Sequence, residues 1–139
     1  MRVVPIESGY FVRLDLGEEI VGTLTALVKE RQITGGSITG IGAVKSAELG
    51  YFDVHRKEYA KRTFEDDMEL VAMNGNITWL EDGEPMIHAH ALLSGADLTA
   101  VGGHLFSAEI AVTGEVFIQT HDSRLERKPD KRTGLKLIG

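Results

Sequence analysis

The chain has 139 residues, a formal net charge of -6 and no cysteine. At this length one domain can bury a core without cross-links, and the lack of cysteine excludes disulfides, thiolate metal sites and a cysteine nucleophile. The net negative charge argues against general affinity for nucleic acid, because phosphate backbones are bound by clustered Lys and Arg. No signal-peptide block or membrane-length apolar run occurs, so we expect a soluble protein without membrane contact, and the absence of cysteine fits a reducing cytoplasm.

One segment has helical periodicity and is expected to form a helix from about Glu18 to Gln32. The apolar residues that recur at helical spacing are Leu16, Ile20, Leu24, Leu27 and Val28. Asp15 with Glu18 three residues later is typical of a capping box at the start of a helix. Lys29 and Arg31 suit the negative end of the helix dipole, and Gly35-Gly36 is expected to reverse the chain beyond it.

The rest of the chain is expected to be extended, with glycine-containing turns between strands. The expected strands are 37–53, 58–65, 68–80, 85–93, 104–112 and 115–121. Asp82-Gly83 is the clearest hairpin turn, whereas Asn74-Gly75 is either a turn or a bulge where another backbone approaches closely. No internal repeat or linker divides the chain. These features predict an α+β fold over 1–139, a single domain with a mainly antiparallel sheet packed by one principal helix.

The last segment, 122–139, differs in composition from the body of the chain. It carries six Lys or Arg residues against three Asp or Glu, and Pro129 interrupts any long helix. Mixed charge near a terminus usually serves solubility. We therefore expect a solvated tail that runs over the surface or packs on a neighbour.

Three of the five histidines lie within residues 85–105. His88 and His90 stand in an otherwise apolar run, expected to be a buried strand, and side-chain alternation puts them on one face, opposite Ala89 and Ala91. Two imidazoles on one face can bind a metal ion together. The alternative is that both rings are buried, hydrogen-bonded and simply fill space.

His104 is the candidate third ligand. It follows Gly102-Gly103, where glycine permits the close backbone approach that would bring the next strand beside the His88 strand. A catalytic zinc site needs three protein ligands and leaves the fourth position for water or substrate. His104 could instead be a turn residue, and spacing alone leaves both interpretations open. His55 and His121 are isolated among polar neighbours and are expected at the surface.

Residues 75–119 resemble the core pattern of the plant- and prokaryote-conserved (PPC) domain. The matching motifs, in the order that the family shows, are Gly75-Asn76-Ile77, Gly83-Glu84-Pro85, His88 with His90, Gly102-Gly103-His104-Leu105 and Glu115-Val116. Upstream, residues 9–20 and 35–53 are similar to the family's opening strand, helix and first hairpin. The resemblance therefore covers nearly the whole chain.

The resemblance implies a compact α+β fold, a homotrimer and a likeness to acetolactate decarboxylase. That enzyme carries zinc on a His-x-His pair plus a further histidine, and the positions that look equivalent are His88, His90 and His104. Zinc bound by neutral imidazoles is therefore implied here. Glu115 is a candidate ligand, or a carboxylate that supports a ligand, with an exposed strand position as the alternative. The decarboxylase's other catalytic groups have no visible counterpart in this sequence.

Two classes of function are consistent with these features. The first is a trimeric PPC protein with a three-histidine zinc site, a regulatory or interaction module associated with DNA or with DNA-associated proteins. The second is a metal-dependent enzyme, lyase-like or hydrolase-like, that acts on a small oxygen-rich molecule. Plant PPC proteins carry a separate Arg-Gly-Arg-Pro AT-hook, which this sequence lacks, so direct DNA binding is not expected. An open metal position in a cavity would favour the enzyme, and a closed or metal-free site would favour the module.

Overall fold

The structure, a computed structural model, describes residues 1–139. In chain order the elements are β1 (Arg2–Ile6), β2 (Gly9–Asp15), α1 (Ile20–Arg31), β3 (Gly35–Asp53), β4 (Glu58–Phe64), β5 (Met68–Leu80), β6 (Pro85–Ser94), β7 (Ala100–His121), β8 (Glu126–Pro129) and β9 (Lys136–Ile138). The single helix and the largely antiparallel sheet match the prediction. The fold is nevertheless mostly β rather than α+β, because the two strands predicted within 104–121 are one long strand and both ends of the chain add further strands.

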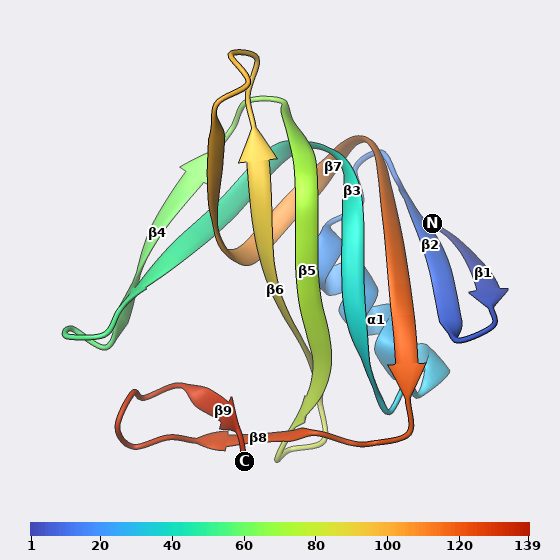
Figure 1. The fold of residues 1–139 in the computed structure, drawn as a ribbon, viewed down its shortest axis with the longest axis vertical. Coiled ribbons are helices and arrows are strands. Elements are labelled where there is room, and N and C mark those ends of the chain that lie inside the picture. Colours follow the sequence, from blue (N-terminus) through green and yellow to red (C-terminus); the bar gives the residue numbers. More distant parts are fainter.

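The strands form one sheet, which Figure 1 shows as strongly bent. Its order is β1-β2-β7-β3-β5-β8-β9, with β4 paired to β3. Strands β3 and β7 are antiparallel partners over most of their length, from Gly35 opposite His121 to Gly50 opposite His104. All the other strand pairs are antiparallel, and β5 and β8 run parallel to each other.

Strand β6 has partners on both of its edges, and this closes part of the sheet into a ring. It pairs with β5 along nearly its whole length and with the first five residues of β7, Ala100 to His104. Beyond that point β7 continues against β3, which itself pairs with β5. Strands β3, β5, β6 and β7 therefore enclose a common interior, and each contributes buried leucine or isoleucine side chains to it.

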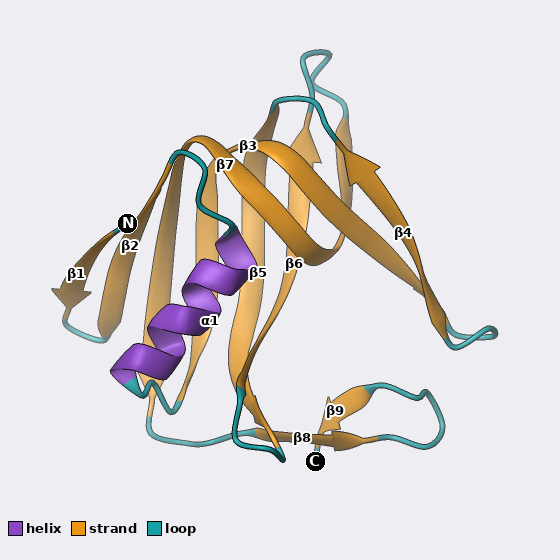
Figure 2. Cartoon of the chain, turned by 180° about the vertical axis from the view of Figure 1, so that it is seen from behind, coloured by secondary structure: helices purple, strands orange, loops and turns teal.

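Helix α1 covers one face of the sheet, as Figure 2 shows. Ile20, Leu24, Leu27 and Val28 are buried against the strands, as predicted. Leu16 does not belong to this apolar face. It precedes the helix and is 66% exposed. With 12 residues in α1, the structure contains no helix with the length and apolar character needed to cross a membrane.

The ends of α1 differ from the prediction. Glu19, not Asp15, caps the helix by accepting hydrogen bonds from the amides of Val21 and Gly22, and α1 begins at Ile20. At the other end Gln32 adopts a left-handed conformation with φ 53°. That residue ends the helix, so Gly35-Gly36 is not the exit turn.

Gly35-Gly36 instead opens β3 at buried positions. A Cβ on Gly36 would lie 2.5 Å from the carbonyl oxygen of Gln119 in β7. The glycines serve the close approach of two strands rather than a reversal of the chain.

The two candidate turn dipeptides have different outcomes. Asp82-Gly83 lies in the turn between β5 and β6, as predicted, where the Leu80 amide donates to the Glu84 carbonyl at 2.8 Å and Gly83 has φ +84°. Asn74-Gly75 is not a turn but lies inside β5. A Cβ at Gly75 would come within 2.5 Å of the His88 carbonyl oxygen, so the alternative of close backbone approach is correct, without a bulge at this point.

Replacing Leu24 with Asp should destabilise the protein by about 3 kcal/mol or more, because it buries an unpaired charge against the sheet. The matched control is Leu16→Asp, at the apolar position that the structure leaves exposed, and it should change stability by less than about 0.5 kcal/mol. Urea unfolding followed by circular dichroism measures both. Equal destabilisation by the two substitutions would contradict this placement of the helix.

Candidate metal centre

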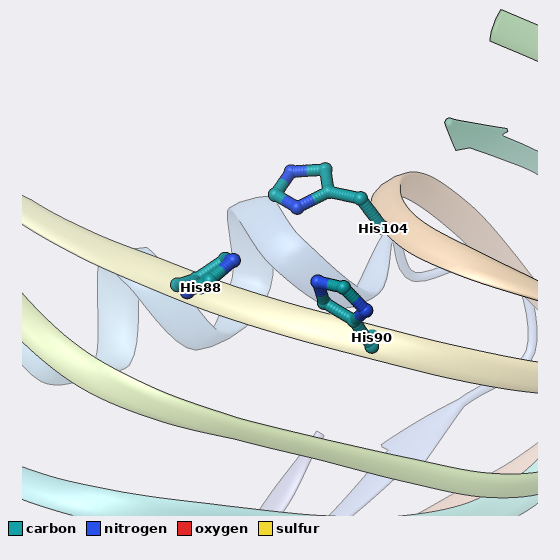
Figure 3. Close-up of side chains that lie close together, drawn as sticks. All are labelled: His88, His90 and His104. Carbon is teal, nitrogen blue, oxygen red and sulfur yellow. The ribbon is translucent and has the colours of Figure 1, made fainter. Parts of the chain in front are cut away.

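Three histidines meet on one face of the β6–β7 ladder (Figure 3). His90 is the register partner of His104, and His88 lies two residues earlier on the same face of β6. The ring centroids of the three pairs are 5.2, 5.4 and 5.5 Å apart, which makes a nearly equilateral triangle. Directly opposed residues of an antiparallel pair are close neighbours, so strand register alone brings His90 to His104. The structure thus brings all three predicted residues to one place.

The local sequence explains why these rings leave the core. Along β6 the small or branched apolar residues Ile87, Ala89 and Ala91 are buried, and the intervening positions, including His88 and His90, point to the opposite face. This is the alternation expected of a strand with one buried face.

The chain returns beside the His88 strand as predicted, and it turns ahead of the two glycines rather than at them. Gly102 and Gly103 lie inside β7, and the chain turns earlier, at 95–99, where Leu98 has φ +63°. Gly103 is needed for close approach, because a Cβ there would lie 2.7 Å from the carbonyl oxygen of Gly50 in β3. That contact lets β7 pass from β6 to β3 at the position of His104.

The triangle fits a metal ion after small adjustments. The ligand atoms of the three residues all lie within 4.8 Å of one another, whereas nitrogens bound to one tetrahedral zinc ion lie roughly 3.4 Å apart. In Figure 3 each ring turns a nitrogen toward the shared space, so small side-chain rotations would close the triangle. Nδ1 of His104 is buried and has no hydrogen-bond partner. A buried polar atom without a partner destabilises the folded chain, and a metal ion would supply the missing partner.

The surroundings keep two of the rings neutral. Burial, and after it the charges of His88 and His90, lower the pKa of His104 from 6.5 to about 4. Burial is also the main reason that the pKa of His88 is lowered, followed by the charge of Arg127. A neutral imidazole has a free lone pair for a metal ion. At neutral pH these two rings therefore need not lose a proton before they bind.

Aromatic side chains pack against the outer side of His104. Its ring centroid is 5.1 Å from that of Tyr59 in β4 and 4.6 Å from that of Phe106 in β7. Lys61 lies 3.8 Å above the Phe106 ring and also pairs with Glu48 at 2.8 Å. This apolar wall accounts for the burial of His104.

Arg127 belongs to the site although sequence reasoning missed it. The tail carries it on β8 to the end of β5, where its Nη2 donates to Nδ1 of His88 at 3.0 Å. The residue is only 6% exposed. The signal that marks buried strands is apolar alternation, and the charged run around Arg127 has none, so the sequence pattern indicated a solvated tail instead.

The other candidate residues lie away from the triad. Glu115 is exposed on β7, opposite Arg13 of β2 and Ile41 of β3, and the structure does not bring it to the histidines. His55 and His121 are exposed, as expected. None of the molecule's five main cavities is lined by a histidine of the triad.

Comparison with known proteins identifies the family. The chain belongs to the Plants and Prokaryotes Conserved (PCC) domain family, the one abbreviated PPC above, whose family model matches residues 1–122. A comparison with curated proteins finds no match.

Solved structures agree with this assignment. A candidate DNA-binding protein from Bacteroides thetaiotaomicron is 32% identical with a TM-score of 0.95, and the match covers 99% of this chain and 96% of that one. A metal-containing protein from Archaeoglobus fulgidus is 36% identical with a TM-score of 0.86 over 99% of both chains. Alpha-acetolactate decarboxylase from Bacillus subtilis is 13% identical with a TM-score of 0.56, over 88% of this chain and 57% of the enzyme, and shares the fold.

The low pKa of His104 should make the metal-free protein less stable in acid. The unfolded chain takes up a proton at His104 near pH 6.5 but the folded chain only near pH 4, so stability falls as the pH drops from 6.5 to 4. The measurement is urea unfolding at pH 7 and pH 4.5 in the presence of a chelator. The variant His104→Asn should lose part of this pH dependence, and the control His55→Asn should keep it. An identical loss of stability in all three proteins would contradict the burial argument.

Proposed function

We propose that this protein is a regulatory or interaction module that works as a homotrimer and holds one zinc ion on His88, His90 and His104. Its proposed location is the cytoplasm, and DNA or DNA-associated proteins are its candidate partners. The observation that carries the proposal is the triangle of three imidazoles, one of which has a buried nitrogen without a partner. That a relative of 36% identity is a metal-containing protein supports it.

The donor set favours zinc over other common ions. Calcium and magnesium prefer oxygen ligands, whereas imidazole nitrogens suit zinc and its neighbours among the transition metals. The triad contains nitrogen donors and no carboxylate. Three ligands leave one tetrahedral position free, and the exposure of the His90 ring supports a position that is open to solvent. When bound, zinc would polarise a carbonyl group or activate water at that position.

A free coordination position on the metal could bind a substrate, so a metal-dependent enzyme, lyase-like or hydrolase-like, is the second candidate function. The module has more support, because no carboxylate joins the three rings to act as a general base and the main cavities lie elsewhere. An enzyme also has to enclose its substrate to exclude water. In one protomer the ring of His90 is exposed.

The homotrimer is supported by apolar side chains on the outside of the sheet. Ile41, Val71, Val112 and Phe117 are between 47% and 71% exposed, and the first three line a shallow cavity together with Glu115. Exposed apolar residues that gather in this way are typical of protein interfaces. Copies of the chain packed here would cover these residues.

Alanine at any one of the three histidines should remove most of the zinc from the purified protein. The rings lie outside the hydrophobic core, so each variant should still fold and assemble to the same molar mass, although it loses the stabilisation that bound zinc gives to the folded chain. Elemental analysis of metal per chain tests this, with His121→Ala as the exposed control that should retain a full complement. Zinc that survives the triple substitution His88→Ala, His90→Ala and His104→Ala would exclude this site.

No tight binding to duplex DNA is expected at physiological salt. The net charge is -6, and several cations are already paired with carboxylates, including Lys29 with Glu84 and Lys45 with Glu109, both at 2.7 Å. Fluorescence anisotropy with a labelled duplex, over a range of salt concentrations, measures this. Nanomolar affinity with a steep salt dependence would contradict it, whereas weak binding would leave DNA-associated proteins as the candidate partners.

A further inference from the structure

Arg127 is a buried cation without a carboxylate partner. Its guanidinium donates to the Thr78 hydroxyl at 2.8 Å, to the Lys136 carbonyl at 2.9 Å and to the Asn76 amide oxygen at 3.3 Å. The fourth contact is the 3.0 Å bond from Nη2 to Nδ1 of His88. Every acceptor is therefore neutral, and one of them is a proposed metal ligand.

This contact fixes the tautomer of His88. A guanidinium has donors only, so Nδ1 must present its lone pair to Arg127. A neutral imidazole has one proton on its two nitrogens, and in this arrangement the proton stands on Nε2. The single lone pair of the ring is thus already in use.

A metal ion needs that same lone pair. If the ion binds Nε2, the proton must be transferred through solvent to Nδ1, where its N–H bond faces the N–H donors of Arg127. If the ion binds Nδ1 instead, it takes the place of the guanidinium directly. In either case the hydrogen bond from Arg127 is lost, and the positive charges of ion and guanidinium repel each other.

We propose that Arg127 and the metal ion compete for His88, so that metal binding expels the guanidinium and loosens the C-terminal segment, residues 126–138. This inference rests on the proposed metal site. It makes the segment the part of the molecule that responds to metal, and Arg127 a positioning residue that holds the metal-free ring.

The segment is held weakly enough to respond. Strand β8 pairs with β5 through only two residues, Glu126 and Arg127, and β9 pairs only with β8. Arg127 is the one residue of the segment that is buried. A segment with few buried contacts unfolds locally at a small cost in free energy. The loss of one anchoring contact is therefore expected to loosen the whole segment 126–138.

Hydrogen exchange of the wild-type protein tests the release. Adding zinc to the metal-free protein should speed exchange of the backbone amides within 126–138. Amides of β6 and of the adjoining part of β7 should exchange more slowly, which shows that zinc has bound at the triad. Unchanged or slower exchange in 126–138 with zinc bound would overturn the proposal.

Zinc affinity provides a second test, measured by competition with a chromophoric chelator. The variant Arg127→Met keeps an apolar chain of similar length but removes the donors, and it should bind zinc about tenfold more tightly or better, since bonds to charged groups are among the stronger ones. The control is Arg124→Met, whose guanidinium lies 4.3 Å from the Trp79 ring and bonds to no histidine; its affinity should not change. Unchanged or weaker binding by Arg127→Met would overturn the proposal.

The tautomer can be checked without any substitution. In long-range proton–nitrogen spectra of the metal-free wild-type protein, His88 should carry its proton on Nε2, and a proton on Nδ1 would refute the competition. The two proposals fail separately. If wild-type protein binds no zinc, the proposed function fails. If it binds zinc and Arg127→Met binds no more tightly, only the competition fails.

Discussion

The pairing of β6 on both of its edges is the constraint on which the rest of this molecule depends. Pairing with β5 buries one face of β6 in the core, and pairing with the start of β7 places His104 directly opposite His90. Beyond His104, β7 pairs with β3 instead of β6. The face of β6 that carries His88 and His90 is therefore left without a strand packed over it. The closed ring thus creates both the hydrophobic interior and the polar site on its outer surface.

The sequence predicted the local elements well. The helix face, the β5–β6 turn and the shared orientation of His88 and His90 follow from side-chain periodicity and turn chemistry, which act over a few residues. Errors arose where long-range packing decides the outcome. Gly35-Gly36 looked like a helix exit but serves the contact between β3 and β7, and the close approach expected at Gly102-Gly103 occurs with β3 as well as with β6.

Arg127 shows a further limit of sequence reasoning. A buried arginine among charged neighbours carries no apolar signature, and its partners Thr78 and Asn76 lie about 50 residues earlier in the chain. Only the fold brings them together. The result is a site in which two neutral rings and a guanidinium without a carboxylate partner are gathered, so a metal ion at the proposed site would meet positive charge. The affinity of the proposed site for a metal ion therefore depends on whether Arg127 stays hydrogen-bonded to His88.

The spacing of these elements along the chain has a consequence for the order of folding. Strands β6 and β7 meet across a short loop at 95–99, whereas β3 and β7 pair residues as far apart as Gly35 and His121. Closing a short loop loses less chain entropy, so we expect the local β6–β7 hairpin to form before the ring closes. On a nascent chain the histidines would meet before β8 is complete. Metal available during synthesis would then reach His88 ahead of its competitor.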